Sequence, residues 1–204
     1  MCIDLPLYNL LLQRTPTDYP NMKGYGQKRY IKKMISLIDK NDPSATEVVL
    51  NGFDISDAKL AVMAMALVNN TVVEKLHLDR TKISDKGASL LAYTLQQNVT
   101  LRLLSLNDNQ IRSAGAEALA TALYDNETLQ TLRLANNDIG SRGGKKLKKM
   151  LRYNESIREI ILDGNAISLT ILDKIDDKCK MLTSIDQSIS TVSTTEIEWA
   201  DLSD

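Results

Sequence analysis

The sequence predicts an α/β fold, a right-handed solenoid of five 28-residue repeats with parallel strands on the concave face and helices on the convex face. The first observation is an aliphatic column with a constant step of 28 residues, made up of Val48, Leu76, Leu104, Leu132 and Ile160. The second is a change of period inside each repeat, from the alternation of a strand to the three- and four-residue spacing of a helix. Repeats of equal length in this register are expected to stack through their aliphatic columns.

Each repeat begins with a short strand. The pattern L-x-x-L-x-L-x-x-N-x-I occupies residues 101–111 and recurs over 73–83, 129–139 and 157–167, with a weaker copy over 45–55. Two further columns keep the same step: Leu50, Leu78, Leu106, Leu134 and Leu162, then Ile55, Ile83, Ile111, Ile139 and Ile167. Since successive side chains of a strand point to opposite faces, these columns predict one buried face and one free face.

A helix follows each strand after a turn. In the third repeat, Leu119 and Leu123 keep helical spacing behind Gly115 and Ala116. The glycine recurs as Gly87 and Gly143, where each helix has to begin close to its neighbour. Small side chains at these positions predict closely packed helices on the convex face.

Asparagine recurs at two positions of the repeat. Asn109, Asn137 and Asn165 follow the strands, where an inward side chain can satisfy turn N–H and C=O groups of its own coil and the next one. We predict a structural ladder there. A second column comprises Asn70, Asn98, Asn126 and Asn154, near the helix C-termini, where we expect the left-handed conformation that closes a helix.

The pattern over residues 45–179 resembles the ribonuclease-inhibitor type of leucine-rich repeat. One helix per 28-residue coil favours this helical, strongly curved subtype over those with extended convex sides. The resemblance implies a protein-binding solenoid and leaves its partner open.

The two ends are expected to carry caps, because a solenoid otherwise exposes its apolar layers. Residues 1–26 form an N-terminal extension, and residues 27–182 form the repeat domain. Its first 14 residues, 27–40, predict an amphipathic cap helix that ends at Asn41-Asp42-Pro43. At the far end, Leu172, Ile175, Cys179 and Leu182 are predicted to close the stack. Residues 183–204 are acidic and rich in Ser and Thr, so we expect a disordered tail.

The sequence at the junction between the cap helix and the first strand resembles that of a second family. The run NDPSATEVVLNGF over residues 41–53 is similar to the start of the repeat domain in tropomodulin and leiomodin. In this sequence the run ends the cap helix, forms a turn and begins the first strand. The resemblance implies an actin filament pointed-end or tropomyosin-associated regulator. The 26 residues ahead of the cap helix leave no room for the tropomyosin-binding and first actin-binding segments of that family, and the present repeats are more regular.

The sequence gives no sign of catalysis. His77 is the single histidine, Cys2 and Cys179 form no metal or redox spacing, and the GSRGGKK run at 140–146 lacks the spacing of a phosphate loop. We therefore predict no enzyme, no metal and no cofactor. With 25 basic and 26 acidic residues, nothing indicates nucleic acid or a membrane as partner. The apolar start carries no basic leader and is not predicted to be a signal peptide, so we expect a cytoplasmic protein. A monomer is expected as well.

Two surfaces are candidates for binding a protein. The strand positions between the apolar columns place a mixed set of side chains on the concave face, with Lys75, His77, Asp79, Ser105, Asn107, Arg133, Glu159, Ile161 and Asp163 as candidate contacts. The fourth helix is crowded with cations, which are Arg142, Lys145, Lys146, Lys148, Lys149 and Arg152. Two of them replace packing residues of the earlier repeats: Lys146 stands where Leu90 and Ala118 do, and Lys148 stands where Ala92 and Ala120 do. An acidic partner, an actin surface or the chain's own acidic tail would suit this helix, as would plain exposure to water with the long stems lying along the neighbouring helix.

The function predicted from these observations is a non-enzymatic scaffold or adaptor that binds a partner protein. The concave face and the basic helix are its candidate contact surfaces. Two alternatives stay open: a tropomodulin-like regulator with actin or tropomyosin as partner, and an inhibitor module that covers the active site of an enzyme.

Overall fold

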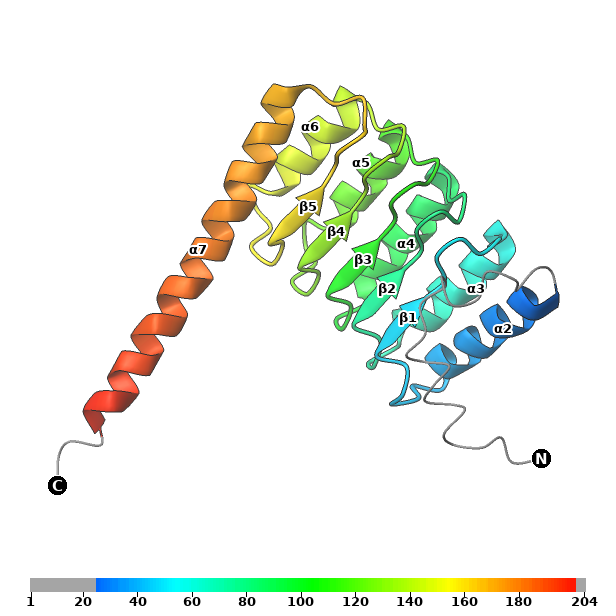
Figure 1. Ribbon diagram of the computed structural model, residues 1–204, viewed down its shortest axis with the longest axis horizontal. Helices are drawn as coiled ribbons and strands as arrows, with labels where there is room; N and C mark the ends of the chain where they lie inside the picture. Colours follow the sequence, from blue (N-terminus) through cyan, green and yellow to red (C-terminus); the bar gives the residue numbers. More distant parts are fainter. Residues whose placement is uncertain (1–24, 201–204) are drawn as a thin grey trace.

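The computed structural model describes residues 25–200, which form one curved solenoid with strands on one side and helices on the other (Figure 1). Helices and strands alternate along the repeats. The helices are α2 (Tyr25–Asp39), α3 (Asp57–Val68), α4 (Asp85–Gln97), α5 (Ser113–Ala122), α6 (Ser141–Met150) and α7 (Leu169–Ala200). The strands are β1 (Glu47–Val49), β2 (Lys75–His77), β3 (Leu103–Ser105), β4 (Thr131–Arg133) and β5 (Glu159–Ile161).

The five strands form one parallel sheet in chain order, β1-β2-β3-β4-β5. Each strand pairs with the next at a register of 28 residues: Val48 faces Leu76, which faces Leu104. The same column continues through Leu132 to Ile160, and all five side chains are buried. The predicted solenoid and its repeat length are therefore confirmed.

The recurring glycines let neighbouring helices approach closely, as predicted. A Cβ atom on Gly143 would lie 2.8 Å from Ile139 Cγ2 and 3.0 Å from the Cβ of Ala116. Both distances are shorter than ordinary van der Waals contact, so any larger residue would push α6 away from α5. Ala116 itself is fully buried, which shows how tightly the helices pack.

The ladder that follows the strands is also confirmed. Asn109 Nδ2 donates to Leu78 O of the preceding coil at 2.8 Å, and Asn109 Oδ1 accepts from the backbone N–H of Ile83 at 2.9 Å. Asn137 and Asn165 repeat this arrangement one and two coils later. One amide therefore satisfies donors and acceptors of turns that would otherwise be buried without partners.

The second asparagine column works differently from the prediction. None of its members has a positive φ, and Asn98 has φ −79° and ψ 130°, an extended conformation. Its side chain acts instead: Asn98 Oδ1 accepts from Leu101 N at 2.7 Å, and Nδ2 donates to Leu67 O at 2.7 Å. These residues join one coil to the preceding coil, and the expectation of left-handed caps is wrong.

The left-handed conformation lies in another column, at the turn after each strand. Residues 52, 80, 108, 136 and 164 all have positive φ, as Gly52, Arg80, Asp108, Asn136 and Gly164. Three of the five carry side chains in a region that favours glycine. The next coil holds this turn: Asn107 O, for example, accepts from the N–H of Arg80 at 3.0 Å.

Both ends of the sheet are capped by helices. Helix α2 buries Ile31, Met34 and Ile38 and ends at Asp39. Asn41, in the turn that follows, has a φ of 51°, which agrees with the predicted helix stop at Asn41-Asp42-Pro43. At the other end, Ile175, Cys179 and Leu182 are buried against the last coil.

The tail differs from the expectation of disorder, since α7 continues without a break to Ala200. The polar composition of residues 183–200 does not prevent a helix here, because a helix that has already begun gains one backbone hydrogen bond for each residue added. Residues 201–204, and most of the extension 1–26, lie outside the described part of the chain. Within that part, no helix is long and apolar enough to cross a membrane.

Candidate protein-binding surfaces

The concave face carries polar side-chain pairs that run between neighbouring strands. Nε2 of His77, the single histidine, lies 3.0 Å from Glu47 Oε1 on the adjacent strand. Arg133 Nη2 lies 3.7 Å from Glu159 Oε2. His77 and Arg133 are half-buried and Glu159 is exposed. These contacts engage some of the polar side chains of the face within the sheet, which leaves fewer of them for a partner.

Three of the predicted concave contacts belong to an internal network. Asp79 Oδ1 accepts from Ser105 Oγ at 2.6 Å and from Asn107 N at 2.8 Å. Asn107 Oδ1 in turn accepts from Ala135 N at 2.8 Å. Ser105 is only 1% exposed, so it cannot offer its hydroxyl to another molecule without rearrangement. The sequence pattern placed these side chains on the right face but could not reveal that they bind the following coil.

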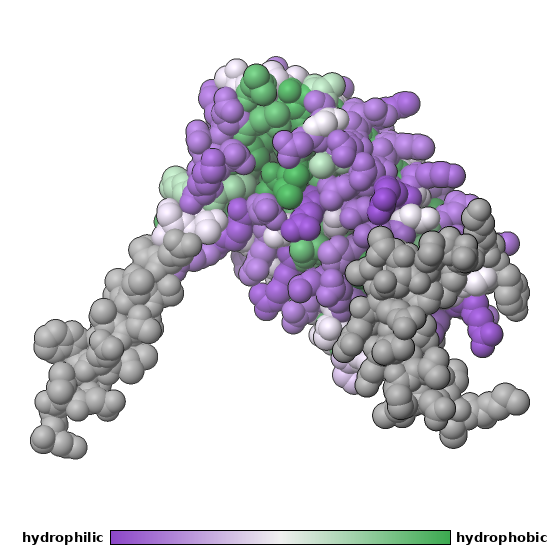
Figure 2. Space-filling model, viewed as in Figure 1, coloured by the Kyte–Doolittle hydropathy of each residue, from purple (hydrophilic) through white to green (hydrophobic). Residues whose placement is uncertain are grey.

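The remaining concave candidates lie near the edges of the sheet. Lys75 and Asp163 are exposed, and Ile161 is half-buried at the end of the sheet beside α7. Figure 2 shows the same face: hydrophilic side chains cover most of it, and hydrophobic ones gather at the end of the solenoid where β5 and α7 lie. The structure thus brings the predicted residues into one row without forming a single continuous charged or apolar site.

The cations of the fourth helix form a convex surface that we call the basic ridge, composed of Arg142, Lys145, Lys146, Lys148, Lys149 and Arg152. Lys148 is half-buried and the other five are exposed. Arg142 forms an ion pair with Glu117 of the preceding helix, with Nη2 and Oε2 3.1 Å apart. Among the described residues, the four lysines form no ion pair. Their charges are therefore available to an acidic partner.

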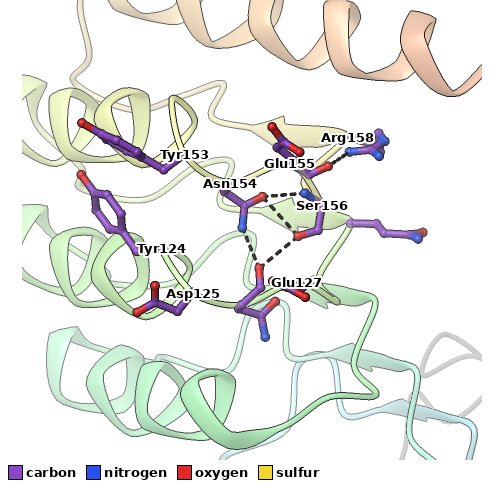
Figure 3. A pocket seen from close by; sticks show the side chains of 10 residues that line it. Tyr124, Asp125, Glu127, Tyr153, Asn154, Glu155, Ser156 and Arg158 are labelled. Carbon is purple, nitrogen blue, oxygen red and sulfur yellow. Dashed lines mark hydrogen bonds between the residues drawn. The ribbon is translucent and has the colours of Figure 1, made fainter.

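A polar pocket of about 590 Å³ lies between the loops that lead into β4 and β5 (Figure 3). The rings of Tyr124 and Tyr153 lie 5.4 Å apart at one side of it, and Asp125, Glu127 and Glu155 add carboxylates. Its floor is structural: Asn154 Nδ2 donates to Asn126 O at 2.7 Å. The sequence pattern did not reveal this pocket, although both tyrosines depart from the 28-residue repeat: Gln96 stands 28 residues before Tyr124, and Asp125 stands 28 residues before Tyr153.

The described residues contain no group of three or more His, Cys, Asp or Glu side chains that could hold a metal ion. Cys179 is buried between α7 and β5, and this burial raises the pKa of its thiol. A thiol that holds its proton more tightly is a weaker nucleophile at neutral pH.

A family model described as the TMOD/LMOD leucine-rich domain matches residues 28–142, more than half of the 204-residue chain. The chain belongs to the tropomodulin/leiomodin leucine-rich domain family. The matched segment begins in α2 and extends through β4 to the start of α6, so it includes the cap helix and four of the five strands.

Solved structures of this tropomodulin/leiomodin family agree with the assignment. The structure of leiomodin-1 actin-binding site 2 matches with a TM-score of 0.75 and 26% identity, covering 82% of this chain and 97% of that one. The tropomodulin C-terminal domain of Caenorhabditis elegans matches with a TM-score of 0.71, covering 79% and 98%. Its 17% identity supports the fold alone. A search of curated proteins found no match.

The tropomodulin/leiomodin assignment fits a protein-interaction module, which was the main prediction in its general form. It agrees better with the more specific alternative, the tropomodulin-like protein. The local resemblance at residues 41–53 therefore indicated the correct family, because helix stop, turn and first strand together are specific to this way of capping the repeats.

Proposed function

We propose that this chain binds actin through its repeat domain and does so without catalysing a reaction. The observation that carries the proposal is the likeness to leiomodin-1 actin-binding site 2, which extends over 97% of that chain at 26% identity. The present protein shares the whole of that folded unit. Association with the actin cytoskeleton follows from the same proposal.

The basic ridge is our candidate for the actin-facing surface. Its exposed lysines, Lys145, Lys146 and Lys149, have no carboxylate partners among the described residues, whereas Asp79, Ser105 and Asn107 on the concave face are engaged with each other. Uncompensated surface charge speeds association with an oppositely charged protein and selects against others. An acidic patch on actin is the partner chemistry that this ridge fits.

The test is binding of the full chain to actin, measured by sedimentation with filaments and by its effect on pyrene-actin polymerisation. We expect the wild-type chain to bind. The double variant Lys146→Glu plus Lys149→Glu is expected to weaken binding by roughly tenfold or more, because each reversal turns an attraction into a repulsion. Both side chains are exposed, so the variant should unfold at the wild-type urea concentration.

A matched control is Lys82→Glu plus Lys86→Glu, which changes the net charge by the same amount at exposed positions on and just before α4. It should bind like the wild type. Absence of any binding by the wild-type chain would remove actin as the partner. Equal losses in both variants would show an effect of net charge alone, and a loss confined to Arg133→Glu would transfer the contact to the concave face.

A further inference from the structure

An apolar groove lies between α2 and α3, the first two helices of the solenoid. These two helices stand at the end of the solenoid opposite α7 (Figure 1). It has a volume of about 980 Å³ and is lined by Ile31 and Ile35 from α2 and by Val62, Met65 and Ala66 from α3, among others. Val62 is 57% exposed and Met65 is 64% exposed. Two large apolar side chains therefore face open space within one helical turn of each other.

The repeat provides an internal comparison for this surface. The outward positions of α3 are Ala58, Ala61, Val62 and Met65. At the same register three repeats later, these positions are Arg142, Lys145, Lys146 and Lys149, the heart of the basic ridge. The repeat thus tolerates charge at all four positions. Its apolar residues in α3 are not required by stacking, so they need another explanation.

Helix α3 is apolar on all sides, with the sequence DAKLAVMAMALV. Its inner side buries Leu60, Met63, Ala64 and Leu67 against the sheet. A helix that is apolar all round is normally covered on its outer side as well. Together with the side chains of α2, the outer face of α3 therefore has the character of an incomplete interface.

The rim of the groove carries three lysines and one acid, Asp39, and does not demand an acidic occupant. Lys28 and Lys32 stand on α2 and Lys59 on α3, and the described residues provide no ion pair for any of them. Lysine stems can lie along an apolar ligand while the ammonium groups stay in water. The groove is thus suited to a mainly apolar segment with few charges.

We propose that residues 3–12 of this same chain dock in the groove between α2 and α3. Their sequence is IDLPLYNLLL, in which seven of ten residues are apolar and Asp4 is the single charge. No repeat position accounts for these side chains, because the segment precedes the cap helix. The apolar segment has no place in the solenoid, and the apolar groove has no cover among the described residues. Both belong to the N-terminal end of the chain, so the segment is the natural occupant of the groove.

The linker between them is long enough. Residues 13–24 connect the segment to Tyr25, the first residue of α2. Twelve residues span up to about 40 Å when extended, and the 15 residues of α2 measure about 22 Å. The segment can therefore reach any point of the groove. Because the tether holds it at a high effective concentration, it outcompetes a free partner of similar affinity.

The chain carries its own means of testing this docking. Cys2 lies next to the segment, whereas Cys179 is buried and burial raises its pKa, so a brief exposure to a maleimide nitroxide at neutral pH labels Cys2 selectively. The methionine methyl groups serve as NMR reporters: Met65 lines the groove, and Met181 lies in α7 at the far end. We expect the label to broaden the Met65 signal severalfold more than that of Met181, and ascorbate to restore it.

Two variants of the labelled full chain check the contact from both sides. Leu10→Glu plus Leu11→Glu in the segment, or Val62→Glu in the groove, should abolish the broadening of Met65. Val62 is exposed, so Val62→Glu should keep the wild-type fold by circular dichroism. Lys146→Glu, at the equivalent outward position three repeats later, is the matched control and should leave the broadening intact.

Other occupants give different results. A Met65 signal that is indifferent to the label overturns the proposal and leaves the groove to a separate partner, such as an acidic amphipathic helix. Spin-labelled chain mixed with unlabelled, methyl-enriched chain tests the second alternative. Broadening of Met65 in that mixture would mean that a second copy fills the groove, which also overturns the proposal.

Discussion

Asn126 shows how a single side chain joins two coils of the solenoid. Its Oδ1 accepts from Leu129 N at 2.8 Å, and its Nδ2 donates to Leu95 O of the preceding coil at 2.8 Å. The residue is only 6% exposed, so water cannot replace these bonds. We predict that Asn126→Ala lowers the free energy of unfolding by about 2–4 kcal/mol, because it strands buried backbone groups without partners. Urea unfolding followed by circular dichroism measures this loss.

Asn69 provides the matched control for this substitution. It is exposed and stands at the end of α3, where its side chain makes no hydrogen bond within the described residues. Asn69→Ala should therefore change the unfolding free energy by less than about 0.5 kcal/mol. Similar losses in the two variants would show that the asparagine column does not act through its side-chain bonds.

Sequence reasoning succeeded for residues whose role is set by periodicity alone. The buried columns and the position of Asn109 follow from a 28-residue step and the alternation of a strand. The role of Asn98 did not follow, because asparagine is suited both to a left-handed turn and to side-chain bonding, and the choice depends on what the preceding coil presents. For the same reason Ser105 was expected on the surface but is held inside by Asp79.

At the scale of elements, α7 is fixed to the last strand by an ion pair. Arg158 Nη2 lies 3.0 Å from Asp186 Oδ1, and Arg158 Nε contacts Oδ2 of the same carboxylate. These hydrogen bonds hold the pKa of Asp186 below its usual value of 3.8. A lowered pKa means that the contact stabilises the fold above the usual value and is lost as the pH falls through the lower, folded value.

We predict that Asp186 titrates below pH 3.8 in the folded chain and that Arg158→Gln returns its pKa toward 3.8. NMR titration of the side-chain carboxyl carbon measures both values. Asp42 is the control: hydrogen bonds from Ser44 lower its pKa at the other end of the solenoid, so its pKa should be the same in both proteins. An Asp186 pKa that stays unchanged in Arg158→Gln would show that the ion pair does not form in solution.

The elements themselves were mostly predictable, and the exceptions have physical causes. The cap helix was expected over 27–40 and lies at Tyr25–Asp39, because its apolar spacing and the Asn-Asp-Pro stop are local signals. The end of α7 was not predictable from composition. Charged residues were expected to replace packing residues in α6. They do so only on the outward side of the helix, because its inner side still packs through the buried residues Gly143, Gly144, Leu147 and Met150.

At the scale of the whole molecule, the convex face changes character from one end to the other. The groove at α2 and α3 is apolar, and the ridge at α6 is cationic, although the same repeat builds both. The repeat sets only the inward positions, so the outward ones are free to serve two different contacts. This division explains why the fold could be predicted from the sequence, whereas the occupants of the outward surfaces could not.

If the basic ridge binds actin, binding should depend on salt even though the net charge is only −1. Exposed charges are screened over about 10 Å at 0.1 M ionic strength, so a contact that relies on the lysines of α6 weakens as salt increases. We predict a severalfold lower affinity at 0.2 M than at 0.05 M potassium chloride in filament sedimentation. The variant Lys146→Glu plus Lys149→Glu should show a much smaller salt dependence, because it lacks the attraction that salt screens. Equal salt dependence in the two proteins would place the electrostatic contact elsewhere on the solenoid.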